Sequence, residues 1–220
     1  MAEVDPKIAV VTGASSGVGL AVTRALLNDG YVVHAQHRSG ATFTAENLHW
    51  WKADFPDLGT VPAVDRLDAL VHCAGVCRLG KVAATDISDW QQALDVNLLA
   101  PVSLTNLLLP ALRAAGGHII YVNSGAGLRA NPNWGTYAAS KFAAKAWCDA
   151  LRAEEPSLRV TSIHPGRIDT PMQEAIVASE GGDYDGSKFL QVETVAASIS
   201  NVLALPGDAQ PTSIELRPRG

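Results

Sequence analysis

The sequence contains few cysteines and few basic residues for its 220 positions. Its three cysteines, Cys73, Cys77 and Cys148, do not suit a disulfide framework. One falls in an apolar strand pattern and one in an apolar helical pattern, so we expect a reducing, cytoplasmic environment. Lysine and arginine total 17 against 22 acidic residues, for a net charge of −5, and they are thinly spread. This distribution excludes the basic surface of a nucleic-acid-binding protein.

The sequence also lacks long apolar runs, linkers and repeats. We find no apolar run of the roughly 18 residues that a membrane-spanning helix needs. Residues 1–7 are polar and acidic, unlike a secretory signal. We therefore expect no membrane, nucleic-acid or metal partner. With 47% hydrophobic residues the chain can bury a large core. Nothing marks a domain boundary, so residues 1–220 are predicted to form one domain.

Short apolar runs alternate with helical patterns along almost the whole chain. Most of the strand candidates are apolar throughout, which is typical of a parallel sheet covered on both faces. These candidates lie at residues 8–12, 31–36, 48–53, 69–73, 118–123, 159–164 and 213–217, and the helical patterns at 18–29, 88–115, 134–153 and 193–205. The order predicts an α/β fold: a Rossmann-type, doubly wound parallel β-sheet of about seven strands flanked by helices.

A glycine-rich loop, residues 12–19 (TGASSGVG), separates the first strand from the first helix. Glycine permits a sharp turn and a close approach to a pyrophosphate, and the helix that follows offers free N–H groups and a positive dipole end. The position of the loop favours a dinucleotide site over a merely structural turn. The residues expected at this site are Gly13, Ser15, Ser16, Gly17, Val18 and Gly19.

The same loop also fits the G-x-S-x-G nucleophile elbow of hydrolases. That elbow normally follows several earlier strands, and no HGGG-type oxyanion segment precedes it here. A serine nucleophile also needs a histidine with an acid behind it, and His164 has no identifiable acidic partner. We therefore rank hydrolysis well below dinucleotide binding.

Tyr137 and Lys141 lie four residues apart on one predicted helix and share a face. A nearby cation stabilises a phenolate, so we expect Lys141 to lower the pKa of Tyr137 towards the working range and to make it a proton donor or acceptor. Ser124 follows the fifth strand, at the edge where α/β sheets bind ligands. Asn97 is a polar residue in a very apolar helix, where either a solvated side chain or a water or backbone network is expected.

In this order and spacing, residues 12–19, Asn97, Ser124, Tyr137 and Lys141 resemble the short-chain dehydrogenases/reductases over residues 7–218. Segment 164–170 (HPGRIDT) resembles the family's Pro-Gly turn facing the nicotinamide. The resemblance implies an oxidoreductase that interconverts a small carbonyl compound and an alcohol.

The resemblance also implies a role for each matching residue. Tyr137 is the acid/base, Lys141 binds the nicotinamide ribose and lowers the tyrosine pKa, Ser124 positions the substrate oxygen, and Asn97 holds the water of a proton relay. Further cofactor contacts are expected from Asp54, Ala74, Gly75, Pro165, Gly166, Ile168 and Thr170.

Two departures from the family pattern affect these expectations. The family's Asn-Asn-Ala-Gly reads His72-Cys73-Ala74-Gly75 here, so backbone contacts alone carry over at this segment. Residues 39–47 are also too few and too polar for a full crossover helix.

The end of the second strand predicts the cofactor. A carboxylate there binds the ribose 2′-OH of NAD and repels a 2′-phosphate. Residues 35–39 contain no acid and include His37 and Arg38, whose donors suit phosphate, so we expect NADP(H). A dinucleotide sensor or scaffold without turnover is the alternative, and the intact Ser-Tyr-Lys set counts against it.

Three further features concern the surface. Wide apolar arcs on helices 88–115 and 134–153 predict a homodimer or homotetramer. Residues 180–189, with three glycines, are predicted to form a lid that closes on cofactor and substrate. Segments 125–134 and 171–189 are expected to line a moderately apolar substrate pocket.

Overall fold

Seven parallel strands form one sheet at the centre of the computed structural model, which describes residues 5–219. Their order across the sheet is β3-β2-β1-β4-β5-β6-β7. The strands are β1 (Ile8–Thr12), β2 (Val32–His37), β3 (Leu48–Lys52), β4 (Ala69–His72), β5 (His118–Val122), β6 (Arg159–Pro165) and β7 (Ser213–Leu216). The predicted α/β fold class is confirmed, and the strands start and end within one or two residues of their predicted bounds.

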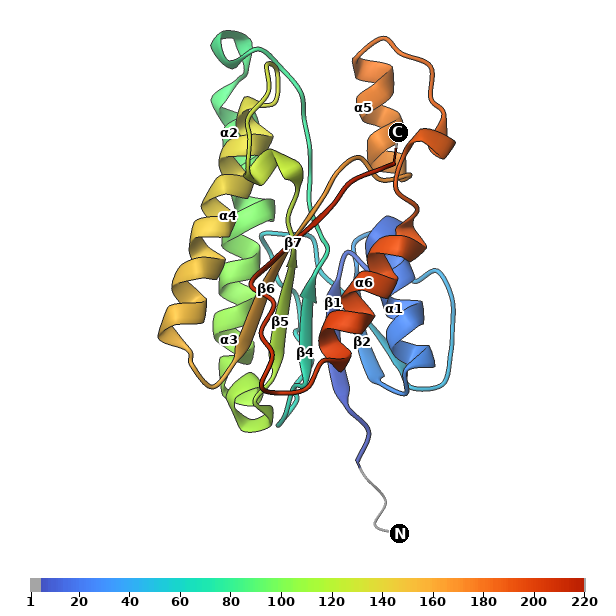
Figure 1. Cartoon of the computed structure of the whole chain (residues 1–220), viewed down its shortest axis with the longest axis vertical. Coiled ribbons are helices and arrows are strands. Elements are labelled where there is room, and N and C mark those ends of the chain that lie inside the picture. Colours follow the sequence, from blue (N-terminus) through green and yellow to red (C-terminus); the bar gives the residue numbers. More distant parts are fainter. Residues whose placement is uncertain (1–4, 220) are drawn as a thin grey trace.

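Helices cover both faces of the sheet (Figure 1). One face carries α1 (Gly17–Asn28) and α6 (Val192–Ala204), and the other carries α2 (Ile87–Leu94), α3 (Ala100–Ala115) and α4 (Gly135–Glu154). Because apolar side chains of the inner strands point to both layers, the core has two halves. Val22 and Leu26 of α1 belong to one half, and Leu104 and Leu108 of α3 to the other.

The predicted helix 88–115 is correct in extent but not uniform. Between α2 and α3 the chain makes a π-helical turn, η2 (Asp95–Leu99), with Asn97 buried at its centre. By length and composition alone, the run Ile87–Ala115 could cross a membrane, which corrects the expectation that no such run exists. In this fold Leu104 and Leu112 of this run are fully buried in the half of the core between α3 and the sheet.

Two connections shape the end of the sheet where the strands finish. No helix forms between β2 and β3, as predicted from the short and polar segment 39–47. After β6 a short helix not predicted from the sequence, α5 (Pro171–Ser179), stands above the sheet (Figure 1). Thr170 caps α5, and its hydroxyl accepts a hydrogen bond from the Gln173 N–H at 3.2 Å. The short turns η1 (Val82–Ala84), η3 (Gly125–Gly127) and η4 (Gly186–Lys188) complete this end.

Candidate active site

The loop between β1 and α1 follows a path that demands glycine. Gly13 and Gly17 have φ angles of +63° and +51°, in the left-handed region that favours glycine. A Cβ on Gly13 would lie 2.8 Å from the backbone of Ala74, and one on Gly19 would overlap the carbonyl oxygen of Gly13. The loop, the start of α1 and the segment after β4 therefore meet with no side chain between them, which is the cradle that a pyrophosphate requires.

The surroundings of this loop leave its hydroxyl groups available to a ligand. Ser16 occupies the N-cap position of α1, yet its side chain makes no capping hydrogen bond. Thr12 is used internally, because its hydroxyl oxygen accepts hydrogen bonds from the N–H groups of Cys73 and Ala74, both at 3.1 Å. Those bonds fasten β1 to the segment after β4.

A first cavity, of about 720 Å³, opens beyond the glycine loop at the ends of β2 and β3. It brings together Ser15, Ser16, Arg38 and Asp54, four of the residues predicted for the cofactor site. His37 is not among the lining residues, and its ring instead meets Trp50 edge-on at 5.9 Å.

A second cavity, of about 210 Å³, continues from the first along the ends of β1, β4 and β5. Every predicted residue of the glycine loop except Ser15 lines it. The other predicted residues that line it are Ala74, Gly75, Tyr137, Lys141, Ile168 and Thr170.

A third cavity, of about 580 Å³, adjoins the second where Tyr137, Ile168 and Thr170 line both. Ser124, Pro165 and Gly166 also line it, together with residues from the two predicted wall segments. Residues of the two predicted wall segments that line this cavity include Leu128, Arg129, Asn131, Trp134, Met172 and Ile176.

Tyr137 lies partly exposed at the wall between the second and third cavities. Burial of the phenol raises its pKa above the ordinary value, the nearby Cys77 adds to this, and hydrogen bonding with Ser124 opposes it. The expected lowering of the Tyr137 pKa is therefore wrong, because desolvation of the phenolate is the largest effect on this group. The raised pKa keeps the phenol protonated, as a proton donor to a carbonyl must be.

Lys141 is almost completely buried beneath Tyr137, with its Nζ 5.7 Å from the centre of the tyrosine ring. Nζ donates to the carbonyl oxygen of Val122 at 3.0 Å and to the Tyr121 hydroxyl at 3.2 Å. Burial lowers the Lys141 pKa to about 8, although the thiol groups Cys77, Cys148 and Cys73 raise it in part. Lys141 therefore remains a cation near neutral pH and titrates in an accessible range.

Asn97 contacts protein with every polar atom of its side chain. Its Oδ1 accepts from the Val76 N–H at 2.8 Å, and its Nδ2 donates to the Val76 carbonyl and to Ser140 Oγ, both at 2.9 Å. The Tyr121 hydroxyl donates to the Asn97 backbone carbonyl. Of the two structural expectations for this helical asparagine, the backbone network is the one that the structure contains.

The departure at residues 72–75 is accommodated by burial. His72 is fully buried, its Nε2 lies 2.9 Å from the Thr105 hydroxyl, and burial lowers its pKa to about 3. Burial also raises the pKa of the Cys73 thiol to about 12. Neither group can supply a charge near neutral pH, so the contribution of this segment to the site is its backbone at Ala74 and Gly75.

The predicted lid makes several contacts with the turn after β6. The Tyr184 hydroxyl donates to Asp169, and Arg167 forms an ion pair with Glu180 at 2.6 Å. Directly after the lid, the Leu190 N–H donates to the Arg167 carbonyl at 3.0 Å. Residues 180–189 are therefore fastened by side chains at a few points, and their closure on a ligand stays a prediction.

The hydrolase interpretation gains nothing from the geometry. Ser15 lines the first cavity with Arg38, whereas the His164 Nδ1 lies 3.0 Å from the backbone carbonyl of Ser124. His164 is not among the residues that line any of the three cavities.

Sequence reasoning missed several residues at the site. Tyr121 belongs to an apolar strand, and no motif in the sequence marks it as a site residue. Gln36 accepts from the Gly13 N–H and donates to the Ala53 carbonyl, both at 2.7 Å, whereas the sequence pattern predicts only a residue at the end of a strand. Gln173 and Arg217 line the third cavity because of where α5 begins and where β7 ends, which no local pattern reveals.

Comparisons with known proteins agree with this geometry. Residues 58–181 match the family model described as short chain dehydrogenase. An uncharacterized short-chain type dehydrogenase/reductase of Sinorhizobium fredii is 32% identical, with 97% of this chain and 92% of that protein covered. A glycine betaine reductase of Emericella nidulans is 33% identical over 97% of this chain, which spans 19% of that longer protein.

A solved structure shares the fold. It is the alcohol dehydrogenase of the archaeon Thermococcus sibiricus complexed with 5-hydroxy-NADP. The TM-score is 0.82, with 24% identity and 96% of each chain covered. This likeness shows the same Rossmann-type arrangement of strands and helices.

Proposed function

Because the chain belongs to the short-chain dehydrogenase/reductase family, we propose that this oxidoreductase interconverts a carbonyl compound and an alcohol with NADP(H), using Tyr137 as its acid/base. One observation carries the proposal. Tyr137 lies at the wall that the second cavity, lined by the glycine loop, shares with the third cavity, lined by Ser124, and the buried Lys141 lies beneath it. A carbonyl held at this wall would face the Tyr137 hydroxyl, and a dinucleotide held by the residues of the second cavity would supply the hydride.

Each residue of the set has a distinct task. Ser124 donates a hydrogen bond that orients the substrate oxygen, and Tyr137 transfers its proton to that oxygen. The Lys141 ammonium stabilises the phenolate that remains. Bound NADPH supplies the hydride that reduces the carbonyl carbon. In the reverse direction Tyr137 accepts the proton of the alcohol.

The glycine cradle supports binding of a dinucleotide, since a side chain on Gly13 or Gly19 would fill the space beside the loop. The preference for NADP(H) is supported by Arg38 and the two loop serines at one cavity, and by the absence of an acid in residues 35–39. The Thermococcus sibiricus structure, which contains a modified NADP, agrees with this choice.

The test is turnover of a panel of aldehydes and ketones, followed by the loss of NADPH absorbance, beside a direct measurement of NADPH binding. We expect both binding and turnover, with turnover reduced at least tenfold in Ser124→Ala. Binding without turnover of any carbonyl would favour the sensor or scaffold alternative.

We further propose that residues 1–220 act as one catalytic domain in a cytoplasmic homodimer or homotetramer with a small-molecule substrate. Exposed apolar side chains on η2, α3 and α4 support the oligomer: Leu99 is 49% exposed, Leu107 58% and Phe142 43%. Burial of these side chains between subunits would remove them from water. The cytoplasmic location rests on the cysteine usage alone.

A further inference from the structure

The third cavity, the one that contains Ser124 and Tyr137, has an unsatisfied buried donor in its wall. Gln173, in the first turn of α5, is 5% exposed and lines the cavity. Its Nε2 has no hydrogen-bond partner among the described residues. An unpaired buried amide donor is unfavourable, so a ligand oxygen that reaches Nε2 would gain a hydrogen bond that the described residues do not supply.

The charge of this cavity is positive. Three arginines line it, and among the lining residues of the described chain the single carboxylate is Glu215. Arg217 forms an ion pair with Glu215 at 2.7 Å, and Arg167 with Glu180 at 2.6 Å. Arg129 is exposed and has no ion pair within residues 5–219. The cavity therefore retains an excess of one positive charge after these pairs are formed.

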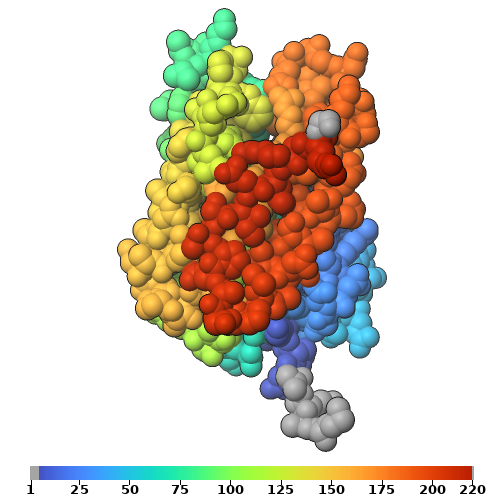
Figure 2. All heavy atoms as spheres, viewed as in Figure 1, coloured from blue at the N-terminus to red at the C-terminus, as the bar shows by residue number. Residues whose placement is uncertain are grey.

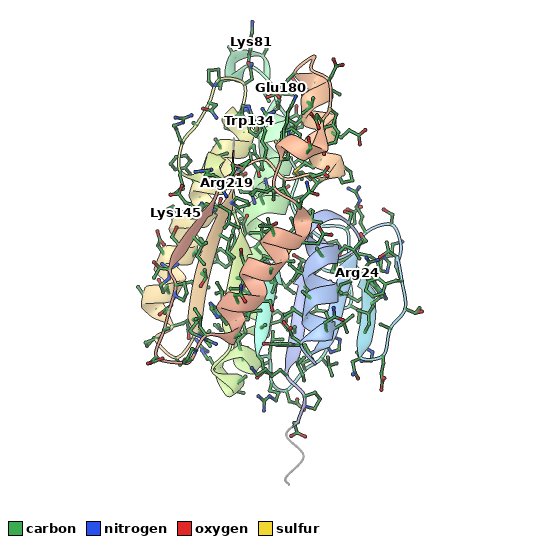
Figure 3. The ribbon with its side chains drawn as sticks, turned by 45° about the vertical axis from the view of Figure 1, so that its right-hand side comes forward. Arg24, Lys81, Trp134, Lys145, Glu180 and Arg219 are labelled. Atoms are coloured by element: carbon green, nitrogen blue, oxygen red, sulfur yellow. The ribbon has the colours of Figure 1, made fainter. Side chains whose placement is uncertain are left out.

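The arginines come from separate parts of the chain that meet at this end of the molecule. Arg167 also lies 5.8 Å from the centre of the Trp134 ring, so its guanidinium contacts both that ring and Glu180. Trp134 and Glu180 are labelled in Figure 3. The Arg217 guanidinium lies against Gly125, next to Ser124, and a Cβ on Gly125 would overlap it. In Figure 2 the C-terminal segment that carries Arg217 crosses the surface towards the region of α5.

We infer from these donors that the substrate is an oxo acid, a carbonyl compound that also carries a carboxylate. The carbonyl binds at Ser124 and Tyr137, and the carboxylate accepts from Gln173 and is attracted by Arg129. Carboxylates match both the planar fork of arginine and the amide donor. Apolar residues such as Leu128 and Ile176 contact the body of the substrate. This inference rests on the proposed function and narrows its substrate class.

The test compares oxo acids with their own methyl esters, because the ester keeps the carbonyl and the shape but loses the charge. We expect kcat/KM for α-oxo or γ-oxo acids to exceed that for the matching esters by about tenfold, the ratio that one charge-assisted contact provides. Gln173→Met and Arg129→Gln should each reduce this ratio towards one, mainly through KM. Arg113→Gln is the matched control, since Arg113 is exposed and pairs with Glu155 away from the cavity.

Esters turned over faster than acids by the unmodified enzyme would overturn the oxo-acid inference while leaving the proposed function intact. An acid preference that is unchanged in both cavity variants would also overturn it. Failure of every acid and every ester contradicts the proposed function itself, so the two failures are distinguishable.

A second, independent observation concerns Tyr121, on β5. This residue is 1% exposed, and its hydroxyl lies between Lys141 and Asn97. It accepts from Lys141 Nζ at 3.2 Å and donates to the Asn97 carbonyl. The carbonyl comes from the π-helical turn η2, where the backbone hydrogen-bond pattern of the helix is interrupted. The Tyr121 hydroxyl therefore connects Lys141 Nζ to the Asn97 backbone carbonyl through two hydrogen bonds between protein groups.

We propose that Tyr121 is a positioning residue that holds the Lys141 ammonium and ends the proton path at this point. The family resemblance places a relay water next to Asn97, but here a phenol joins Lys141 to the Asn97 carbonyl. A backbone carbonyl accepts a hydrogen bond and has no proton to pass on. The proton that Tyr137 gives to the substrate must therefore be replaced from the cavity side. This proposal also rests on the proposed function.

Other titratable groups surround Lys141, and burial keeps them uncharged near neutral pH. Burial raises the pKa of the Cys148 thiol to about 11, and it raises the pKa of Tyr121 well above its ordinary value. The full set facing Nζ from neighbouring elements comprises Tyr137 and Cys148 of α4, Tyr121 of β5, His72 of β4, and Cys73 and Cys77 after β4. A change in the pH profile on removal of the Tyr121 hydroxyl can then be assigned to Lys141.

The test is the pH dependence of kcat in Tyr121→Phe, which removes one oxygen and keeps the ring. Loss of an acceptor disfavours the ammonium, so the basic limb of the profile should move down by about one pH unit, as expected for one hydrogen bond to a charged group. Thr161→Val is the matched control, since it removes a buried hydroxyl that bonds His118 at 2.8 Å. An unchanged limb in a folded, active Tyr121→Phe overturns the proposal.

The unmodified enzyme provides a second measurement that does not depend on the folding of any variant. The rate is followed in mixtures of light and heavy water. A linear dependence on deuterium fraction, which means one proton in flight, supports a path that ends at the Asn97 carbonyl. A curved dependence, which means several protons moving together, overturns it.

Discussion

Cofactor selectivity should depend on Arg38. This residue is exposed at the first cavity, where Ser15, Ser16 and Asp54 also lie, and no ion pair holds it within residues 5–219. Residues 35–39 contain no carboxylate that would repel a 2′-phosphate. A charge-assisted hydrogen bond at a solvent-accessible site contributes about 1.4 kcal/mol, a factor of about ten in binding.

The variant Arg38→Ala removes the guanidinium and leaves the glycine cradle untouched. We expect the KM for NADPH to rise about tenfold and the KM for NADH to stay within about twofold, with kcat almost unchanged. The unmodified enzyme should prefer NADPH by about tenfold or more in kcat/KM. Arg66→Ala is the matched control, because Arg66 is an exposed arginine that pairs with Asp68 on another part of the surface.

Steady-state kinetics with both cofactors, on one carbonyl substrate and at one ionic strength, decide the matter. Equal shifts of the two KM values in Arg38→Ala would refute the assignment, because Arg38 would then contribute equally to binding of both cofactors. Preference of the unmodified enzyme for NADH would refute it as well.

Three other properties can be measured directly. Protease cleavage within residues 180–189 should slow markedly when NADP(H) is added, and equal rates with and without cofactor would count against a closing lid. Light scattering should give the mass of a dimer or tetramer, and Leu107→Glu or Phe142→Glu should shift it towards monomer; a monomeric parent chain contradicts the oligomer. Burial lowers the pKa of His72 and of His118 from 6.5 to about 3, so below about pH 6.5 the unfolded chain takes up protons that the folded chain excludes. The free energy of unfolding should therefore decrease as the pH is lowered from about 6.5 to about 3, by up to about 1.4 kcal/mol per pH unit for each histidine. A denaturation series that shows no such decrease would contradict the burial of these histidines as neutral groups.

The sheet could be predicted from the sequence because its strands are buried on both faces. The run from Ala69 to His72 is wholly buried, so each residue needs to be apolar or internally hydrogen-bonded, and that requirement is visible as an uninterrupted apolar run. The helix that starts at Pro171 has a local signal in the sequence, because Thr170 followed by Pro171 is a typical N-cap and first helical residue.

The candidate site was only partly predictable. The glycines of residues 13–19 and the pair Tyr137–Lys141 occur as local patterns, and the structure brings them together at the second cavity. Two features depend on packing between β5 and the helical layer: the π-helical turn at Asp95–Leu99 and the hydrogen bond from Tyr121 to the Asn97 carbonyl. Such packing cannot be predicted from a local sequence pattern. The pKa of Tyr137 also depends on burial, which spacing alone cannot supply.

Transfer of deuterium from NADPH labelled at the nicotinamide C4 tests the central claim most directly. The unmodified enzyme should place the label on the carbonyl carbon of its substrate. Tyr137→Phe should still bind NADPH but transfer the label at least about a hundredfold more slowly, the typical contribution of a general acid. Transfer at an undiminished rate in Tyr137→Phe would contradict the assignment of Tyr137 as the acid/base.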